Sequence, residues 1–151
     1  MTNEELKLVL AGLLPSASFE EGMEWPVIII EPTSWKSLAE QLNRTAGLEF
    51  DFLFCLTCVD WKTHLTMVFH LTSTIHRHTL VVKSKLDRNN AEIETVAHIW
   101  QTAEFHEREV YDLFGVKFLH HPDLRRLFMT DEYIGWPLRK DFEDAVNMIR
   151  L

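Results

Sequence analysis

The stretch His64–Ser73, HLTMVFHLTS, alternates apolar and polar side chains with the period of two that a β-strand imposes. Leu65, Met67, Phe69 and Leu71 fall on one face of such a strand, and the other face carries mostly His and Thr. In antiparallel sheets this alternation is typical of a strand with one face on the core. The stretch therefore predicts a sheet that is covered on one side.

Similar patterns predict neighbouring strands. Phe50–Asp60 precedes the central stretch and Arg77–Leu86 follows it, and the short connections favour antiparallel pairing. An earlier apolar run, Trp25–Pro32, reads as a short buried strand bounded by prolines. A further short strand is expected in VKF, residues 116–118.

Helical patterns lie on both sides of these strands. Thr2 and Glu5 have the spacing of a capping box, which predicts a helix that ends near residues 12–15. Thr33 or Ser34 can cap a second helix, which Gly47 ends. The helical period returns over residues 91–115, as one helix with a possible break near residues 101–102 or as two short helices.

Together these elements predict a single α+β domain, with helices packed on one face of a mixed or antiparallel sheet. We expect a core domain over residues 1–120 and an irregular C-terminal segment over residues 121–151, called here the extension. The net charge is −8, and no part of the chain has the excess of basic residues typical of a nucleic-acid binder. No signal peptide or membrane span is evident, so we expect a cytoplasmic location.

The extension has no lasting helical or strand period, yet it is rich in large apolar side chains and arginines. A disordered tail is normally poor in aromatics, and structureless segments of about 20 residues are usually functional. Arginine and aromatic side chains are enriched where interfaces bind most tightly. The residues alone therefore favour a binding module whose extension docks on a partner.

Enzyme chemistry is the alternative. HEREV, residues 106–110, begins like a zinc-protease helix, but Val110 stands where the second histidine belongs. Cys55 and Cys58 lie in a predicted buried strand, on which residues three apart point to opposite faces, so they read as core cysteines. Glu107, Glu109 and Asp112 read as a partly exposed, salt-bridged helix face, with Arg108 four residues before Asp112.

Three blocks carry a family resemblance: EREVYDLFGVKF (107–118), HPDLRRLF (121–128) and GWPLRKDF (135–142). In order and spacing they resemble the C subunit, the 30-kilodalton subunit, of respiratory NADH:quinone oxidoreductase (complex I). Related subunits occur in energy-converting membrane-bound hydrogenases. The resemblance covers roughly residues 50–142, and the last block is the most specific.

The resemblance implies a non-catalytic assembly subunit of the hydrophilic arm, on the cytoplasmic side of the membrane, that docks against the quinone-site subunit. It implies no cofactor in this subunit, whereas the parent complex carries FMN, iron–sulfur clusters and quinone and couples electron transfer from NADH to ion translocation. Contact with the membrane would come only through the complex. A stand-alone metal- or thiol-dependent enzyme remains the alternative.

The motif residues are expected to have structural and docking roles, with much of the order of the extension supplied by neighbouring subunits. They are Glu107, Arg108, Glu109, Asp112, Gly115, His121, Pro122, Asp123, Arg125, Arg126, Gly135, Pro137, Leu138, Arg139, Lys140 and Asp141.

The chain departs from the family pattern at three places. His120 stands where the family usually has glycine, Phe105 replaces a tryptophan, and Gln101 replaces a proline. The first departure puts in doubt any backbone conformation at residue 120 that requires glycine.

Overall fold

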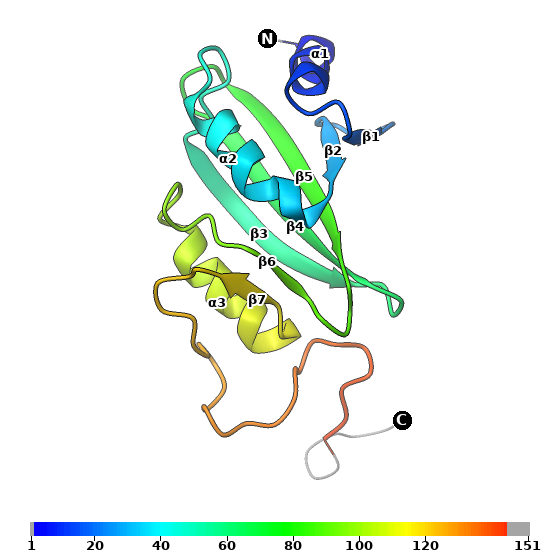
Figure 1. The fold of residues 1–151 in the computed structure, drawn as a ribbon, viewed down its shortest axis with the longest axis vertical. Helices are drawn as coiled ribbons and strands as arrows, with labels where there is room; N and C mark the ends of the chain where they lie inside the picture. The colour runs from blue at the N-terminus through cyan, green and yellow to red at the C-terminus, as the bar shows by residue number, and fades with distance from the viewer. Residues whose placement is uncertain (1, 145–151) are drawn as a thin grey trace.

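The computed structural model describes residues 2–144 and contains a five-stranded mixed sheet in the order β1-β2-β5-β4-β3 (Figure 1). The helices and strands of the main layer are α1 (Asn3–Leu13), β1 (Ser18–Glu20), β2 (Val27–Ile30), α2 (Trp35–Arg44), β3 (Phe52–Asp60), β4 (Leu65–Ser73) and β5 (His78–Leu86). Both pairings of β4 are antiparallel, and β2 runs parallel to β5. The predicted α+β class and the antiparallel neighbours of β4 are confirmed.

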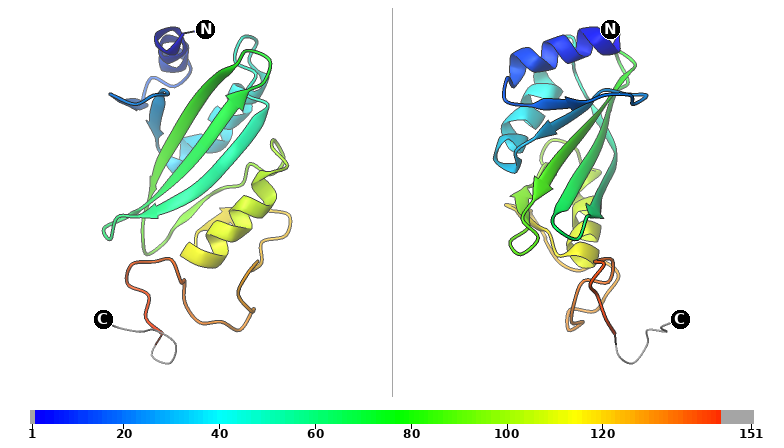
Figure 2. Two further views of the ribbon diagram at one scale, coloured as in Figure 1. Left: turned by 180° about the vertical axis from the view of Figure 1, so that it is seen from behind. Right: turned by 90° about the vertical axis from the view of Figure 1, so that its right-hand side faces the viewer.

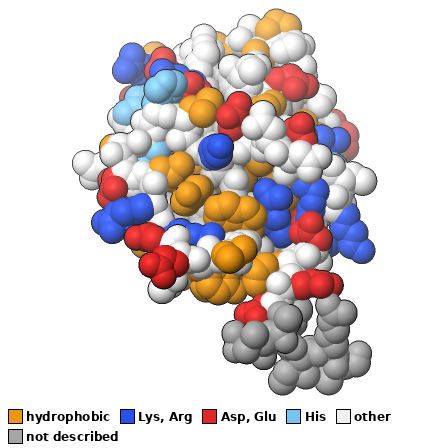
Figure 3. All heavy atoms as spheres, turned by 60° about the horizontal axis from the view of Figure 1, so that its bottom comes forward, with side chains coloured by type: hydrophobic (Ala, Val, Ile, Leu, Met, Phe, Trp, Pro, Cys, Tyr) orange, Lys and Arg blue, Asp and Glu red, His pale blue; other side chains and the backbone are white. Residues whose placement is uncertain are grey.

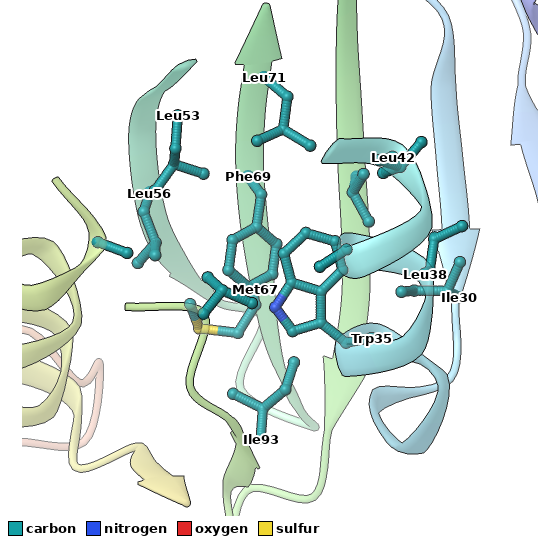
Figure 4. Close-up of a cluster of buried hydrophobic side chains, with 14 of the residues drawn as sticks. Ile30, Trp35, Leu38, Leu42, Leu53, Leu56, Met67, Phe69, Leu71 and Ile93 are labelled. Atoms are coloured by element: carbon teal, nitrogen blue, oxygen red, sulfur yellow. The ribbon is translucent and has the colours of Figure 1, made fainter. Parts of the chain in front are cut away.

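One face of β4 forms the centre of the core. Leu65, Met67, Phe69 and Leu71 are completely buried, as the alternation of this stretch predicts. Figure 4 shows Met67, Phe69 and Leu71 on the face of the sheet that α2 covers, where the indole of Trp35 stacks on the Phe69 ring with centroids 4.2 Å apart. In the view from behind in Figure 2, left, α2 lies on the far side of the sheet, so this helix covers one face only.

Helices α1 and α2 begin in different ways. At α1 the Thr2 hydroxyl accepts the Glu5 N–H while the Glu5 carboxylate accepts the Thr2 N–H, so the predicted capping box is confirmed. At α2 the expected side-chain cap is wrong, because Ser34 makes no capping hydrogen bond. A turn of 3-10 helix over Pro32–Ser34 leads directly into α2, with proline supplying a pre-set backbone angle at its start.

A second, two-stranded sheet corrects the helix predicted over residues 91–115. Its strands β6 (Glu92–Glu94) and β7 (Lys117–Leu119) are parallel, and the helix between them, α3 (Ala103–Phe114), begins only after residue 102. Ile93 and Val96 are buried in the main core, and Trp100 donates from its indole to the Phe50 carbonyl. These tertiary contacts hold the first half of the segment out of the helix that its apolar spacing favours.

His120, directly after β7, has the left-handed backbone angle φ of +65°. The conformation that normally favours glycine is therefore present at this position despite the side chain. Its imidazole contacts the Glu94 carboxylate, Nδ1 to Oε2 at 2.8 Å, so the side chain that strains the backbone also links the ends of β7 and β6.

The two cysteines lie on opposite faces of β3, as predicted. Cys58 pairs with Met67 and belongs to the main core cluster, whereas Cys55 pairs with His70 and is only half-buried. Burial, with a smaller contribution from the negative charge of Asp60, raises the pKa of the Cys58 thiol to about 12.

We therefore expect iodoacetamide to alkylate Cys55 in the folded chain much faster than Cys58, because the thiolate is the reactive form. Peptide mass spectrometry after a short labelling time measures both sites, with the denatured chain as the control that labels equally. Equal labelling of the native chain, or a Cys55–Cys58 disulfide under mild oxidation, would contradict this placement.

Candidate docking surface

The last turn of α3 is completed by the extension. α3 ends at Gly115, which has the left-handed φ of +77°, and it has no basic residue in its last turn. The exposed carbonyls of that turn normally need hydrogen-bond donors. Here the Leu138 N–H donates to the Leu113 carbonyl at 3.0 Å, and Arg139 Nε donates to the Phe114 carbonyl at 2.6 Å. The helix is therefore capped by residues that are distant in the sequence.

The completely buried Asp112 is the main anchor of the extension. Its Oδ2 accepts three successive backbone N–H groups, from Leu127, Phe128 and Met129, at 3.2, 2.6 and 3.0 Å, and its Oδ1 accepts Arg126 Nη1 at 3.2 Å. Hydrogen bonds to an ionised group are about twice as strong as neutral ones. The predicted partly exposed, salt-bridged helix face is therefore wrong, because Asp112 and Glu107 point inward and Asp112 pairs with Arg126.

Arg126 joins the two halves of the extension. Its side chain is 8% exposed, its Nη2 donates to the Gly135 carbonyl at 2.9 Å, and its guanidinium lies 4.6 Å from the centre of a Trp136 ring. The Trp136 indole in turn lies against Gly115, where an added Cβ would come within 2.6 Å of it. Gly115 is thus required both by its backbone angle and by the close approach of the indole.

Arg108 and Glu107 are neighbours on α3 and bind different partners. Arg108 is nearly buried and donates from Nε and Nη2 to the Arg125 and Arg126 carbonyls, both at 3.2 Å. Glu107 accepts the Thr95 hydroxyl at 2.7 and 2.8 Å and the Val96 N–H at 3.0 Å. Arg108 therefore holds the extension, whereas Glu107 holds the segment that follows β6.

Besides Asp112, a second carboxylate anchors the extension: the buried Asp60 at the end of β3 holds its far part. It accepts the Lys140 and Lys62 N–H groups, each at 2.7 Å, and pairs with Arg88, which also contacts Asp141. Burial alone would raise the pKa of Asp60, but the hydrogen bonds from Arg88, Lys140 and Lys62 outweigh it and hold that pKa well below the usual range. Sequence reasoning missed Asp60; the only signal was an acid ending an apolar strand.

The structure brings most of the predicted residues to one region and leaves others apart. Those that anchor the extension or are contacted by it are Arg108, Asp112, Gly115, Arg126, Gly135, Leu138, Arg139, Lys140 and Asp141. At the start of the extension, His121 contacts the Glu104 carbonyl at 3.0 Å, and Asp123 pairs with Arg125 on the surface. Pro122 is exposed, and Glu109 and Pro137 are half-buried.

These anchors argue against the expectation that neighbouring subunits supply much of the order of the extension. Over residues 121–144 the backbone and the arginines bind groups of the same chain; residues 145–151, part of the predicted extension, lie outside the described residues.

Four apolar side chains of the extension remain exposed. Phe128 is 63% exposed, Ile134 92% and Leu138 52%, and Leu127 is also exposed. Figure 3 shows hydrophobic side chains gathered in the middle of this end of the molecule, with basic and acidic side chains around them. We call Leu127, Phe128, Ile134 and Leu138 the apolar patch. Exposed apolar groups with a polar rim are typical of interaction sites.

Residues 2–144 include no group of three or more His, Cys, Asp or Glu side chains placed to hold a metal ion. In the same part of the chain, no helix combines the length and the apolar character that a membrane span needs.

The fold and this surface define a small α+β domain with an internally anchored extension that exposes apolar side chains. The chain belongs to the family described as "Respiratory-chain NADH dehydrogenase, 30 Kd subunit", which matches residues 28–146.

Similar chains occur in several respiratory enzymes. The chain is 38% identical over 135 residues to the C subunit of the NADH-quinone oxidoreductase of Moorella thermoacetica, covering 88% of this chain and 90% of that protein. It is 37% identical over 144 residues to the C subunit of the F(420)H(2) dehydrogenase of Methanosarcina mazei, covering 91% and 90%. With the C/D subunit of the NADH-quinone oxidoreductase of Phocaeicola vulgatus it shares 43% identity over 124 residues, 81% of this chain, and spans only 24% of that longer protein.

Solved structures support the fold. A structure described as Nqo5 of the trypsin-resistant fragment (1-134) matches with a TM-score of 0.68 and 26% identity, covering 82% of this chain and all of that one. A chain of the membrane-bound sulfane sulfur reductase, an archaeal respiratory membrane complex, matches with a TM-score of 0.79 at 24% identity, covering 94% and 86%.

Replacing Asp112 by Asn should lower the free energy of unfolding by about 3–5 kcal/mol, because Arg126 would lose its charged partner in a buried site. Urea unfolding followed by tryptophan fluorescence measures the change. Glu109→Gln, on the same helix and half-buried, is the matched control and should cost less than about 0.5 kcal/mol. Equal effects of the two changes would contradict the anchoring role of Asp112.

Gly115→Ala should cost about 2–4 kcal/mol, since the left-handed backbone disfavours a side chain and the new methyl group would displace Trp136. Gly12→Ala is the control: it lies in α1 with no atom within 4 Å of the added Cβ, so it should be neutral or stabilising. The melting temperatures of the two variants test this difference, and similar melting temperatures would refute the close approach.

Proposed function

We propose that the protein is a non-catalytic assembly subunit of the hydrophilic arm of NADH:quinone oxidoreductase or of a related complex. In this role it docks through the apolar patch on the quinone-site subunit and supports electron transfer to quinone without carrying a flavin, cluster or metal of its own. It would sit on the cytoplasmic side of the membrane and meet the membrane only through the complex, with no role in nucleic-acid binding.

One observation carries this proposal. Arg126, Arg139 and several backbone N–H groups of the extension are bound within the chain, whereas Phe128, Ile134 and Leu138 are left exposed. A segment that served only to cover its own domain would gain stability by turning these side chains inward. Rigid presentation of apolar side chains is what a docking surface needs, because it reduces the entropy lost on binding.

The names of the relatives agree with a role that does not depend on the electron donor. Chains similar to this one are named as subunits of an NADH-quinone oxidoreductase and of an F(420)H(2) dehydrogenase. The longer relative from Phocaeicola vulgatus bears the double name C/D, which indicates two subunits joined in one polypeptide. This supports a D-type subunit as the partner, and we infer that it is the one that forms the quinone site.

The alternative, a stand-alone metal- or thiol-dependent enzyme, has less support. Burial raises the pKa of the Cys58 thiol to about 12, which suppresses the thiolate that a nucleophile requires. Metal analysis of the purified chain tests the alternative directly: a stoichiometric metal ion or a visible chromophore would favour it over a docking role.

Phe128→Ser combined with Ile134→Ser should lower the fraction of the chain found in the assembled membrane complex by a factor of about ten or more, as expected for the loss of interface hot spots. Turnover per assembled complex should stay near normal, because no catalytic group is removed. Affinity purification from membranes, with quantification of co-purifying subunits, measures both quantities.

Ile75→Ser is the matched control, because Ile75 is 61% exposed in the turn between β4 and β5, outside the extension. It should leave assembly unchanged. Normal assembly of the Phe128 and Ile134 variant would refute the docking site, and normal assembly with lost turnover would point to a direct part in proton or quinone chemistry.

A further inference from the structure

A second cluster of titratable side chains lies at the start of the extension, away from the apolar patch. It lines a pocket of about 440 Å³ where α2, β6, the loop after β6, α3 and the end of β7 meet. Its charged and titratable members are Lys36, Glu40, Glu94, His98, Glu104 and His120. Three carboxylates and two imidazoles therefore surround one opening.

Two histidine–carboxylate contacts cross this pocket, and each joins different parts of the fold. His98 Nε2 lies 3.5 Å from Glu40 Oε1, which links the loop after β6 to α2. His120 Nδ1 lies 2.8 Å from Glu94 Oε2, which links the end of β7 to β6. Each contact is an ion pair only while the imidazole carries a proton, which histidine in general loses between about pH 5 and 8.

The backbone at His120 makes one of these contacts more important. Its φ of +65° is a left-handed conformation that is unfavourable for a residue other than glycine. The contact with Glu94 offsets more of this backbone cost when the His120 imidazole is charged than when it is neutral.

Glu107 is bonded to Thr95, which lines the pocket, and its bonding places a carboxyl group among neutral donors. It is completely buried, and it accepts hydrogen bonds from the Thr95 hydroxyl and the Val96 N–H. Burial, opposed by these hydrogen bonds and reinforced by the negative charge of Glu104, raises the pKa of Glu107 to about 7.

Loss of the Glu107 proton and loss of the two histidine–carboxylate ion pairs would act in the same direction. Because the pKa of Glu107 is higher in the folded chain than its ordinary value, the folded state binds this proton more tightly and loses stability as the pH rises from about 4.5 to 7. When the two imidazoles are neutral, Glu40, Glu94 and Glu104 line the pocket with Lys36 as its one remaining basic side chain.

We propose that this cluster is a proton-sensitive latch, which fastens β6, the loop after it and the start of the extension to α2 and α3 near pH 6 and loosens them near pH 8. The moving part is the segment from β6 to residue 102, which crosses the pocket and has little regular structure beyond its three-residue strand.

One neighbouring group opposes the latch. His121 Nδ1 accepts the Asp123 N–H at 3.0 Å, and its other nitrogen contacts the Glu104 carbonyl at 3.0 Å, so protonation of His121 would break the first of these bonds. In the main sheet, burial lowers the pKa of His70 and His78, which makes overall stability rise with pH up to about the ordinary value. The effect of pH on the latch must therefore be measured at individual residues and not by global unfolding.

Hydrogen exchange of the full chain at pH 6 and pH 8, corrected for the intrinsic effect of pH on exchange, tests the latch. The pKa of about 7 predicts that protection of the Val96 and Ala97 amides falls about tenfold between these pH values. Glu107→Gln should abolish most of this fall, because the amide keeps the size of the side chain and cannot ionise. Glu109→Gln should leave the fall unchanged.

The double change His98→Gln with His120→Gln tests the histidine–carboxylate contacts separately, because Glu107 is kept. It should reduce the pH dependence of exchange over residues 117–121. Equal protection at both pH values in the native chain, or a tenfold fall that persists in the Glu107→Gln variant, would overturn the latch. Because the latch is a property of the single chain, its failure would leave the proposed docking function untouched.

Discussion

The position of the extension depends on one buried carboxylate, Asp112. Three successive N–H groups converge on its Oδ2 and a guanidinium approaches its Oδ1, so an irregular backbone is fixed without a helix or strand. An ionised carboxylate without these donors would be very costly to bury, and the donors without the carboxylate would be left unpaired. Each side of the contact therefore requires the other, which makes the end of α3 and the extension a single unit.

The same arrangement explains why the extension exposes apolar side chains. Arg126, Arg139 and several N–H groups are turned inward to Asp112, Asp60 and the carbonyls at the end of α3, whereas Leu127, Phe128, Ile134 and Leu138 are exposed. This inverts the usual division between a polar surface and an apolar core. In the proposed docking role, a partner covers the apolar patch.

Much of the sheet could be predicted from the sequence, because apolar and polar side chains alternate along its strands with a period of two. The alternation around Phe69 placed β4 correctly, and the short connections indicated its antiparallel neighbours. The start of α3 could not be predicted, because Ile93 and Val96 have helical spacing but are held by contacts to distant residues. For the extension, the family motif indicated the segment but could not distinguish Arg126, whose side chain is bound within the chain, from Phe128, which is exposed. Asp60 was missed because its partners lie 28 and 80 residues away.

The central claim is that the extension is anchored by its own domain before any partner binds. Hydrogen exchange of the isolated chain measures this most directly at the Leu127, Phe128, Met129 and Lys140 amides, which donate to the two buried carboxylates. Internal anchoring predicts that these four amides exchange slowly, at rates nearer to those of β4 than to those of free peptide. Exchange at the rate of free peptide, with protection gained only in the assembled complex, would contradict it.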